Sequence, residues 1–185
     1  MTDVTGVTPG VFTLRPWRTG DAAAVLTAFG RPEMARQAGR PVTTPAEAAE
    51  WIVDRSRDRV AGTGYSWAVT DGTDAVLGCV AVTAVNRTHD TGWISYWTVK
   101  AARGRGVASA GLCALARWAF DDLGLFRLEL GHRTNNPASC AVAMRAGFAV
   151  EGLERARLRY GDVRYDVERH ARLATDPVPL PGAPG

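Results

Sequence analysis

The pattern of apolar and polar residues along the chain predicts strands and helices in a mixed order. Short runs rich in apolar, β-branched and aromatic residues predict seven strands, over 11–17, 65–70, 75–85, 92–99, 125–130, 147–158 and 165–173. Helical periodicity and cap residues predict four helices, over 19–30, 43–60, 104–122 and 136–148. Helices separate some of the strands and short turns join others, so we expect an α/β (α+β) fold with a mixed, mostly antiparallel sheet and helices on both faces.

The helix over 43–60 has the clearest boundary signal. Thr44 stands at the N-cap position, Pro45 at the first helical position and Glu47 three residues after the cap. This is a capping-box pattern, in which the two side chains bind each other's backbone N–H groups. Asp71 and Gly72 lie between two strand runs and predict a hairpin turn there.

Length and composition are typical of one globular domain. The chain has 185 residues, of which 46% are hydrophobic and 22% charged. We expect flexible ends over 1–10 and over the Pro/Gly-rich 175–185, with a single domain over 11–174. No run of about 18 apolar residues and no signal-peptide pattern is visible, so we expect a cytoplasmic protein without a membrane partner.

Charge and cysteine content narrow the class of ligand. The net charge of +3 is too small to indicate a nucleic-acid partner, but it suits an anionic ligand. Cys79, Cys113 and Cys140 lack CxxC spacing. We therefore expect small buried cysteines, with neither a disulfide framework nor a zinc or other metal site.

The stretch RGRGVA, residues 103–108, contains two glycines where a predicted strand passes into a predicted helix. At Gly104 and Gly106 no side chain would keep an anion away from the unpaired N–H groups of the first helical turn. Arg103 and Arg105 add positive charge, so phosphate or pyrophosphate is the expected ligand. The alternative is a tight turn flanked by surface arginines.

Two known phosphate motifs can be compared with this stretch. A P-loop is excluded because G-x-x-x-x-G-K-[ST] occurs nowhere in the chain. A dinucleotide fingerprint would need Gly or Ala where Ser109 stands, although Glu129 lies at a suitable distance for a ribose-binding acid. A nicotinamide-dependent oxidoreductase therefore remains one alternative.

Several motifs together resemble the GNAT acyltransferase superfamily. The stretch 103–108 resembles its R/Q-x-x-G-x-G/A acetyl-CoA motif, and NNPASCAVAMRAGFAVEG resembles the N-x-x-S…GF…EG signature of the branch that includes the ribosomal-protein alanine N-acetyltransferases. LRPWRTGDAAAV and YGDVRYDVERHARL also resemble that branch, so the resemblance covers residues 12–174. It implies a GNAT fold of about seven strands, splayed between the fourth and fifth.

The resemblance implies transfer of an acetyl group from acetyl-CoA to a primary amine, by direct attack in a ternary complex. The amine would belong to a protein N-terminus or a small molecule. Ser139 would be the general acid near the thioether. The residues expected to bind the cofactor are Val99, Arg103, Gly104, Arg105, Gly106, Val107, Ala108 and Asn136. Asn136 could equally be only an N-cap, and Ser139 only a first-turn serine that binds backbone.

The general base is not identified by sequence. Relatives often carry a Glu where Trp93 stands here, which leaves Asp90, Glu129, His132 or a water molecule as proton acceptor. This departure also motivates a second alternative, a non-catalytic module that binds acyl-CoA.

We expect Trp51 and the loop 30–44 to determine the acceptor. The sequence leaves the acceptor itself open, and also whether the protein forms a homodimer.

Overall fold

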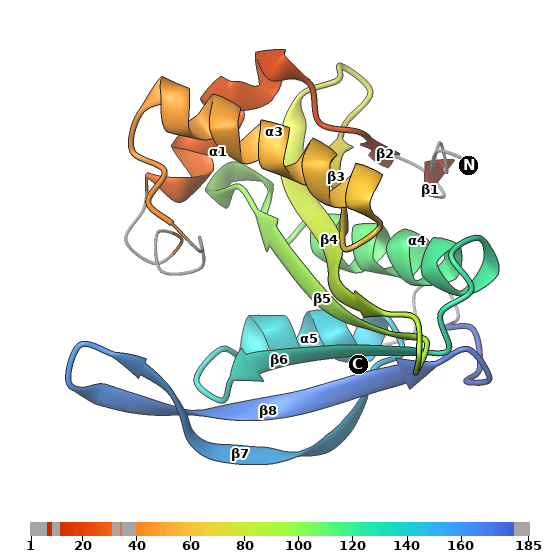
Figure 1. Cartoon of the computed structure of the whole chain (residues 1–185). Helices are drawn as coiled ribbons and strands as arrows, with labels where there is room; N and C mark the ends of the chain where they lie inside the picture. The colour runs from red at the N-terminus through yellow and green to blue at the C-terminus, as the bar shows by residue number, and fades with distance from the viewer. Residues whose placement is uncertain (1–6, 9–11, 31–33, 35–39, 180–185) are drawn as a thin grey trace.

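The computed structural model describes residues 7–8, 12–30, 34 and 40–179. Eight strands form one sheet in the order β1-β2-β3-β4-β5-β6-β8-β7 (Figure 1). Every neighbouring pair is antiparallel except β5 and β6, which are parallel. The strands are β1 (Val7–Thr8), β2 (Phe12–Arg15), β3 (Tyr65–Thr70), β4 (Val76–Asn86), β5 (Thr91–Thr98), β6 (Arg127–Arg133), β7 (Ala149–Tyr160) and β8 (Val163–Leu173). The expected mixed, mostly antiparallel sheet is confirmed.

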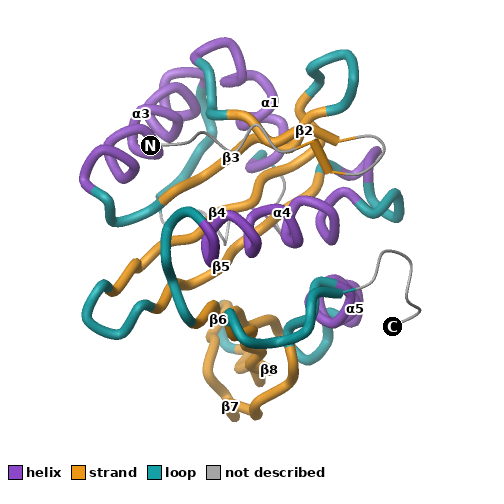
Figure 2. The backbone as a smooth tube through the Cα atoms, turned by 90° about the vertical axis from the view of Figure 1, so that its right-hand side faces the viewer, coloured by secondary structure: helices purple, strands orange, loops and turns teal. Residues whose placement is uncertain are grey.

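Helices cover both faces of this sheet. The described helices are η1 (Thr19–Asp21), α1 (Ala22–Phe29), α3 (Pro45–Ala61), η2 (Lys100–Ala102), α4 (Val107–Asp121) and α5 (Pro137–Arg145). On one face α1 and α3 enclose a cluster that includes Trp17, Phe29 and Trp51. On the other face α4 and α5 pack over a larger cluster that includes Trp67 and Leu112 (Figure 2).

The predicted boundaries are close to those observed. Helix α3 begins at Pro45, the Thr44 side chain accepts a hydrogen bond from the Glu47 N–H, and Glu47 binds back, so the capping box is confirmed. Helix α4 begins at Val107 rather than Gly104, because Gly104 and Gly106 have positive φ angles of 76° and 80° that no helix contains.

The two ends of the chain lie largely outside the described residues. Within the segment expected to be flexible, Val7 and Thr8 form β1 and pair with Thr13 and Phe12. This short strand brings the sheet to eight strands rather than seven. None of the helices in the described part of the chain combines the length and the apolar character that a membrane span needs.

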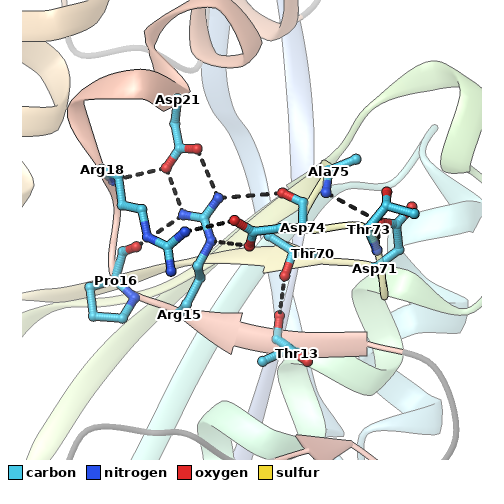
Figure 3. Close-up of polar contacts among 10 residues, drawn as sticks. All are labelled: Thr13, Arg15, Pro16, Arg18, Asp21, Thr70, Asp71, Thr73, Asp74 and Ala75. Atoms are coloured by element: carbon cyan, nitrogen blue, oxygen red, sulfur yellow. Dashed lines mark hydrogen bonds and ion pairs between the residues drawn. The ribbon is translucent and has the colours of Figure 1, made fainter.

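A buried ion pair joins β2 to the start of α1 and to the turn between β3 and β4 (Figure 3). The Arg15 guanidinium donates to both carboxylate oxygens of Asp21, at 2.7 and 2.9 Å, and to Asp74 at 2.6 Å. Asp21 also accepts from the backbone N–H of Arg18 at 2.8 Å. Burial alone would raise the pKa of Asp21, but the bonds from Arg15 and Arg18 outweigh burial and lower that pKa.

Asp21→Ala should lower the free energy of unfolding by about 2 to 3 kcal/mol at pH 7, because it removes bonds to a buried charge. Since the pKa of Asp21 is lowered on folding, its contribution is present above the unfolded value of about 4 and is lost as pH falls through the folded value. The matched control is Asp162→Ala, which removes an exposed ion pair with Arg159. This control should leave the free energy of unfolding nearly unchanged. Equal losses in urea unfolding would contradict the assignment.

Candidate functional site

Strands β5 and β6 pair at one end and then separate. Their pairing covers only Thr91 to Trp93 of β5, opposite Arg127 to Glu129 of β6. Beyond these residues the two strands diverge, as Figure 1 shows. The expected splay is therefore present, between the strands labelled β5 and β6.

Tyr96 spans this opening. Tyr96 belongs to β5, and its hydroxyl donates a 3.0 Å hydrogen bond to the backbone carbonyl of Ser139 in α5. Burial raises the pKa of Tyr96 to about 12, so the group is a neutral donor at physiological pH. Sequence analysis did not single out this hydroxyl, because the distance across a splay cannot be read from one strand.

The β6-facing edge of β5 is open after Trp93. The Val99 N–H donates to the Leu77 carbonyl at 2.9 Å, and the Val99 carbonyl accepts from Ala102. Both backbone groups of Val99, the residue expected to bond the cofactor, are thus already used. Backbone groups alternate in direction along an antiparallel strand, so those of Tyr96 and Thr98 face the splay.

The glycine loop leads from β5 to α4 and leaves the start of this helix without a side-chain cap. Gly106 is the N-cap residue, and its carbonyl accepts from Ala110. Within the described chain, no residue accepts from the N–H groups of Val107, Ala108 or Ser109. Helices α3 and α5, by contrast, are capped by Thr44 and Asn136. The unfilled donors at α4 are suited to an anion.

The surface of the loop is open around these donors. Arg103, Gly104, Arg105 and Gly106 are all exposed, and a methyl group placed on either glycine would meet nothing within 4 Å. The side of the loop towards β5 and α1 borders a cavity of about 280 Å³. The lining residues are Thr27, Ala28, Met34, Trp97, Thr98, Val99, Lys100, Ala101 and Arg103. Arg103 therefore lines a partly apolar hollow, and the open amides follow a few residues later in the chain.

Asn136 and Ser139 form the first turn of α5 across the splay. The Asn136 side chain accepts from the Ser139 N–H at 3.3 Å and donates to the Ser139 hydroxyl oxygen at 2.9 Å. Asn136 therefore caps the helix and also orients the hydroxyl. Since that oxygen accepts from Asn136, its own proton is available for another acceptor, and none is found among the described residues.

The three side chains considered as general base lie in different parts of the structure. Asp90 lies before Thr91, at the closed end of the splay, where its carbonyl accepts from Phe126 and Arg127. Glu129 is opposite Trp93 in the parallel register, but it is bound by Arg127 at 2.6 Å and Arg169 at 2.7 Å. Asp90 is thus distant from the open edge of β5, and the Glu129 carboxylate is occupied by two arginines.

His132, the third candidate, is buried and has other partners. Its Nε2 atom lies 2.9 Å from Nε2 of His170 and 3.3 Å from a Glu168 oxygen. Cys140 lies 3.4 Å from the same Glu168 oxygen. The His132–Cys140–Glu168–His170 cluster was missed from the sequence because its members come from three separate elements.

Trp51, which was expected to help determine the acceptor, is buried. It is 8% exposed and packs edge-on against Trp17, with the ring centroids 5.1 Å apart, and against Phe29. In the loop 30–44, the positions 31–33 and 35–39 lie outside the described residues. Met34 is buried and lines the cavity beside the glycine loop.

Comparison with known proteins adds sequence and fold relatives. A family model described as acetyltransferase (GNAT) domain matches residues 12–149. A ribosomal-protein-serine acetyltransferase of Escherichia coli (strain K12) is 30% identical over 100 residues, 54% of this chain and 56% of that protein. The probable N-acetyltransferase YjcK of Bacillus subtilis (strain 168) is 31% identical over 104 residues, 56% of this chain and 58% of that protein. The matched part spans little more than half the length of these curated relatives.

Solved structures share the fold at low sequence identity. The complex of RimL, a ribosomal L7/L12 alpha-N-protein acetyltransferase, with coenzyme A has a TM-score of 0.81 at 21% identity, and the match covers 90% of this chain and 96% of that one. Mycobacterium smegmatis RimJ in complex with CoA-disulfide has a TM-score of 0.80 at 24% identity, covering 89% and 83%.

Proposed function

Because the chain belongs to the GNAT acetyltransferase family, we propose that it transfers an acetyl group from acetyl-CoA to a primary amine. The observation that carries this proposal is the uncapped start of α4, where open amides and two exposed arginines adjoin the splay. Family membership sets aside the nicotinamide-dependent oxidoreductase that the two glycines left open.

The cofactor is proposed to bind along the loop and the open strand edge. The pyrophosphate would accept from the amides of Val107 and Ala108, with Arg103 and Arg105 adding charge. The pantetheine amides would pair with the backbone of Tyr96 and Thr98, as an added strand does. This arrangement would bring the thioester towards the first turn of α5, where Asn136 and Ser139 lie.

The proposed reaction is direct attack of the amine nitrogen on the thioester carbonyl carbon. A C–N bond forms, the carbonyl oxygen carries negative charge in the tetrahedral intermediate, and the C–S bond then breaks. Ser139 would donate its proton to the leaving thiolate, because its hydroxyl is held by Asn136 and its proton is not otherwise bound. Positioning of the two substrates would supply much of the remaining rate enhancement.

Water is the proposed acceptor of the amine proton. Asp90, Glu129 and His132 are each distant from the open edge or engaged with other side chains. An α-amine has a pKa of about 7.7 to 8.0, so a sizeable minority of it is already neutral at pH 7. A protein N-terminal α-amine therefore suits a site without a dedicated base.

The acceptor is proposed to be a protein N-terminus or a small amine. The curated relatives include one named for a ribosomal protein, and structural relatives include a spermidine N-acetyltransferase chimera. The second candidate, a non-catalytic acyl-CoA-binding module, is favoured by Trp93 and by the occupied carboxylate of Glu129. Binding of acetyl-CoA without transfer to any amine would distinguish it.

Gly106→Val should abolish detectable CoA binding in isothermal titration, because a branched side chain would cover the amides at the start of α4. The control is Gly161→Val in the turn between β7 and β8, where φ is also positive, at 60°, and the surrounding space is also open. Both variants carry a similar backbone strain. If the two lost CoA affinity equally, the proposed phosphate site would be wrong.

Ser139→Ala should leave the CoA dissociation constant within twofold and lower kcat on the order of 100-fold, as expected when a general acid is removed. Thiol release under saturating acetyl-CoA measures kcat. Ser56→Ala is the control, because it removes a helical serine hydroxyl that bonds the Ile52 carbonyl and lies away from the splay. An unchanged kcat in Ser139→Ala would remove the hydroxyl from the mechanism.

A further inference from the structure

Four side chains with metal-binding atoms converge beneath α5. His132 comes from β6, Glu168 and His170 from β8, and Cys140 from α5. Their ligand atoms all lie within 4.8 Å of one another. The two histidines are buried, and Cys140 and Glu168 are half-buried. The register of the sheet makes this arrangement, because His132 pairs directly with Glu168 and Leu130 pairs with His170.

Hydrogen bonds to the backbone fix which nitrogen of each histidine carries the proton. Nδ1 of His132 lies 3.1 Å from the carbonyl oxygen of Arg133, and Nδ1 of His170 lies 3.2 Å from that of Phe148. A carbonyl oxygen can only accept, so both Nδ1 atoms must be donors. In a neutral imidazole the other nitrogen, Nε2, then holds an unshared electron pair.

The two Nε2 electron pairs therefore face each other at 2.9 Å. One oxygen of Glu168 adds a third acceptor, 2.9 Å from His170 Nε2 and 3.3 Å from His132 Nε2. The thiol of Cys140 lies against the same oxygen, at 3.4 Å. Three acceptors held this close repel one another, and a cation between them would stabilise the arrangement. A proton could satisfy one of these pairs, whereas a metal ion would be bound by all the groups together.

We propose that His132, Cys140, Glu168 and His170 bind a zinc ion. Two imidazole nitrogens, one carboxylate and the Cys140 thiolate, formed as the thiol releases its proton to solvent on binding, make a four-ligand set of the kind that zinc accepts. Tetrahedral zinc with ligand distances of about 2.0 to 2.3 Å separates its ligand atoms by roughly 3.3 to 3.7 Å. The 3.3 Å and 3.4 Å separations at Glu168 already match, and the two 2.9 Å separations need to open by about half an ångström. The widest separation, up to 4.8 Å between Cys140 and a histidine, needs to close by about one ångström.

The surroundings also fit a metal site. A histidine that binds a metal through one nitrogen usually donates its other N–H to a carbonyl or carboxylate. Here the Nδ1–H groups of His132 and His170 donate to the carbonyls of Arg133 and Phe148. Cys140 and Glu168 are partly exposed, so the ion has a path of entry from solvent.

The site has a structural consequence for its neighbour. Cys140 directly follows Ser139 in α5, so a bound zinc ion would fix the first turn of this helix to β6 and β8. The zinc site stands on its own ligands and does not depend on the proposed acetyl transfer.

The sequence predicted no metal site because none of the cysteines has CxxC spacing. That rule detects only ligands that are close along the chain. Cys140 and Glu168 are separated by 28 positions, and only the folded sheet brings them together.

The test uses the full chain without an affinity tag, freed of metal by a chelator and then titrated with Zn²⁺ by isothermal titration. We expect one ion per chain and a raised unfolding temperature. Titration with Co²⁺ should give a near-ultraviolet thiolate-to-cobalt band. Cys140→Ala should lose this band, and His170→Ala should lose stoichiometric binding.

Cys113→Ala and His89→Ala are the controls, since the half-buried Cys113 and the exposed His89 lie outside the cluster. Both should bind as the unaltered protein does. Circular dichroism checks that each variant is folded. Glu168→Gln, which keeps the shape of the side chain, replaces any variant that is not folded and should also weaken binding. Absence of stoichiometric binding by the unaltered protein, or equal binding by cluster and control variants, would overturn the proposal.

Discussion

The early end of pairing between β5 and β6 is the constraint on which the rest of the site depends. After three paired residues the strands separate, and the backbone groups of Tyr96 and Thr98 face the gap without a neighbouring strand. Unpaired backbone groups inside a sheet are costly unless a ligand or water binds them. The same divergence places the start of α4 on one side of the opening and Ser139 on the other. The sheet thus places an open strand edge, the proposed anion site and a hydroxyl group around one gap.

Polar contacts hold the two halves of the sheet on either side of this gap. In the first half, Arg15 binds Asp21 and Asp74 and so ties β2 to the turn between β3 and β4. In the second half, the His132–Cys140–Glu168–His170 cluster joins β6, β8 and α5. Only the hydroxyl of Tyr96 bonds across the splay to Ser139 among the side chains described there. Each half is therefore held together by its own polar contacts, with the opening between them.

Local features of the site could be predicted from sequence, and long-range ones could not. The Thr44 and Glu47 capping box and the Asn136 cap follow from residues three positions apart, and the structure confirms both. The glycine loop was also predicted, because backbone freedom is a local property. Trp51 was expected to help determine the acceptor, and its burial against Trp17 and Phe29 depends on tertiary packing that the sequence alone does not show. The histidine and cysteine cluster depends on strand register, which a single sequence does not specify.

The measurement that tests the central claim most directly is titration of the purified protein with acetyl-CoA, followed in the same sample by thiol release. The acceptors should be a panel of N-terminal peptides and small amines. The account predicts saturable binding at one site per chain and thiol release with at least one acceptor. Absence of acetyl-CoA binding by the folded protein would contradict it, because the open amides at the start of α4 would then have another purpose.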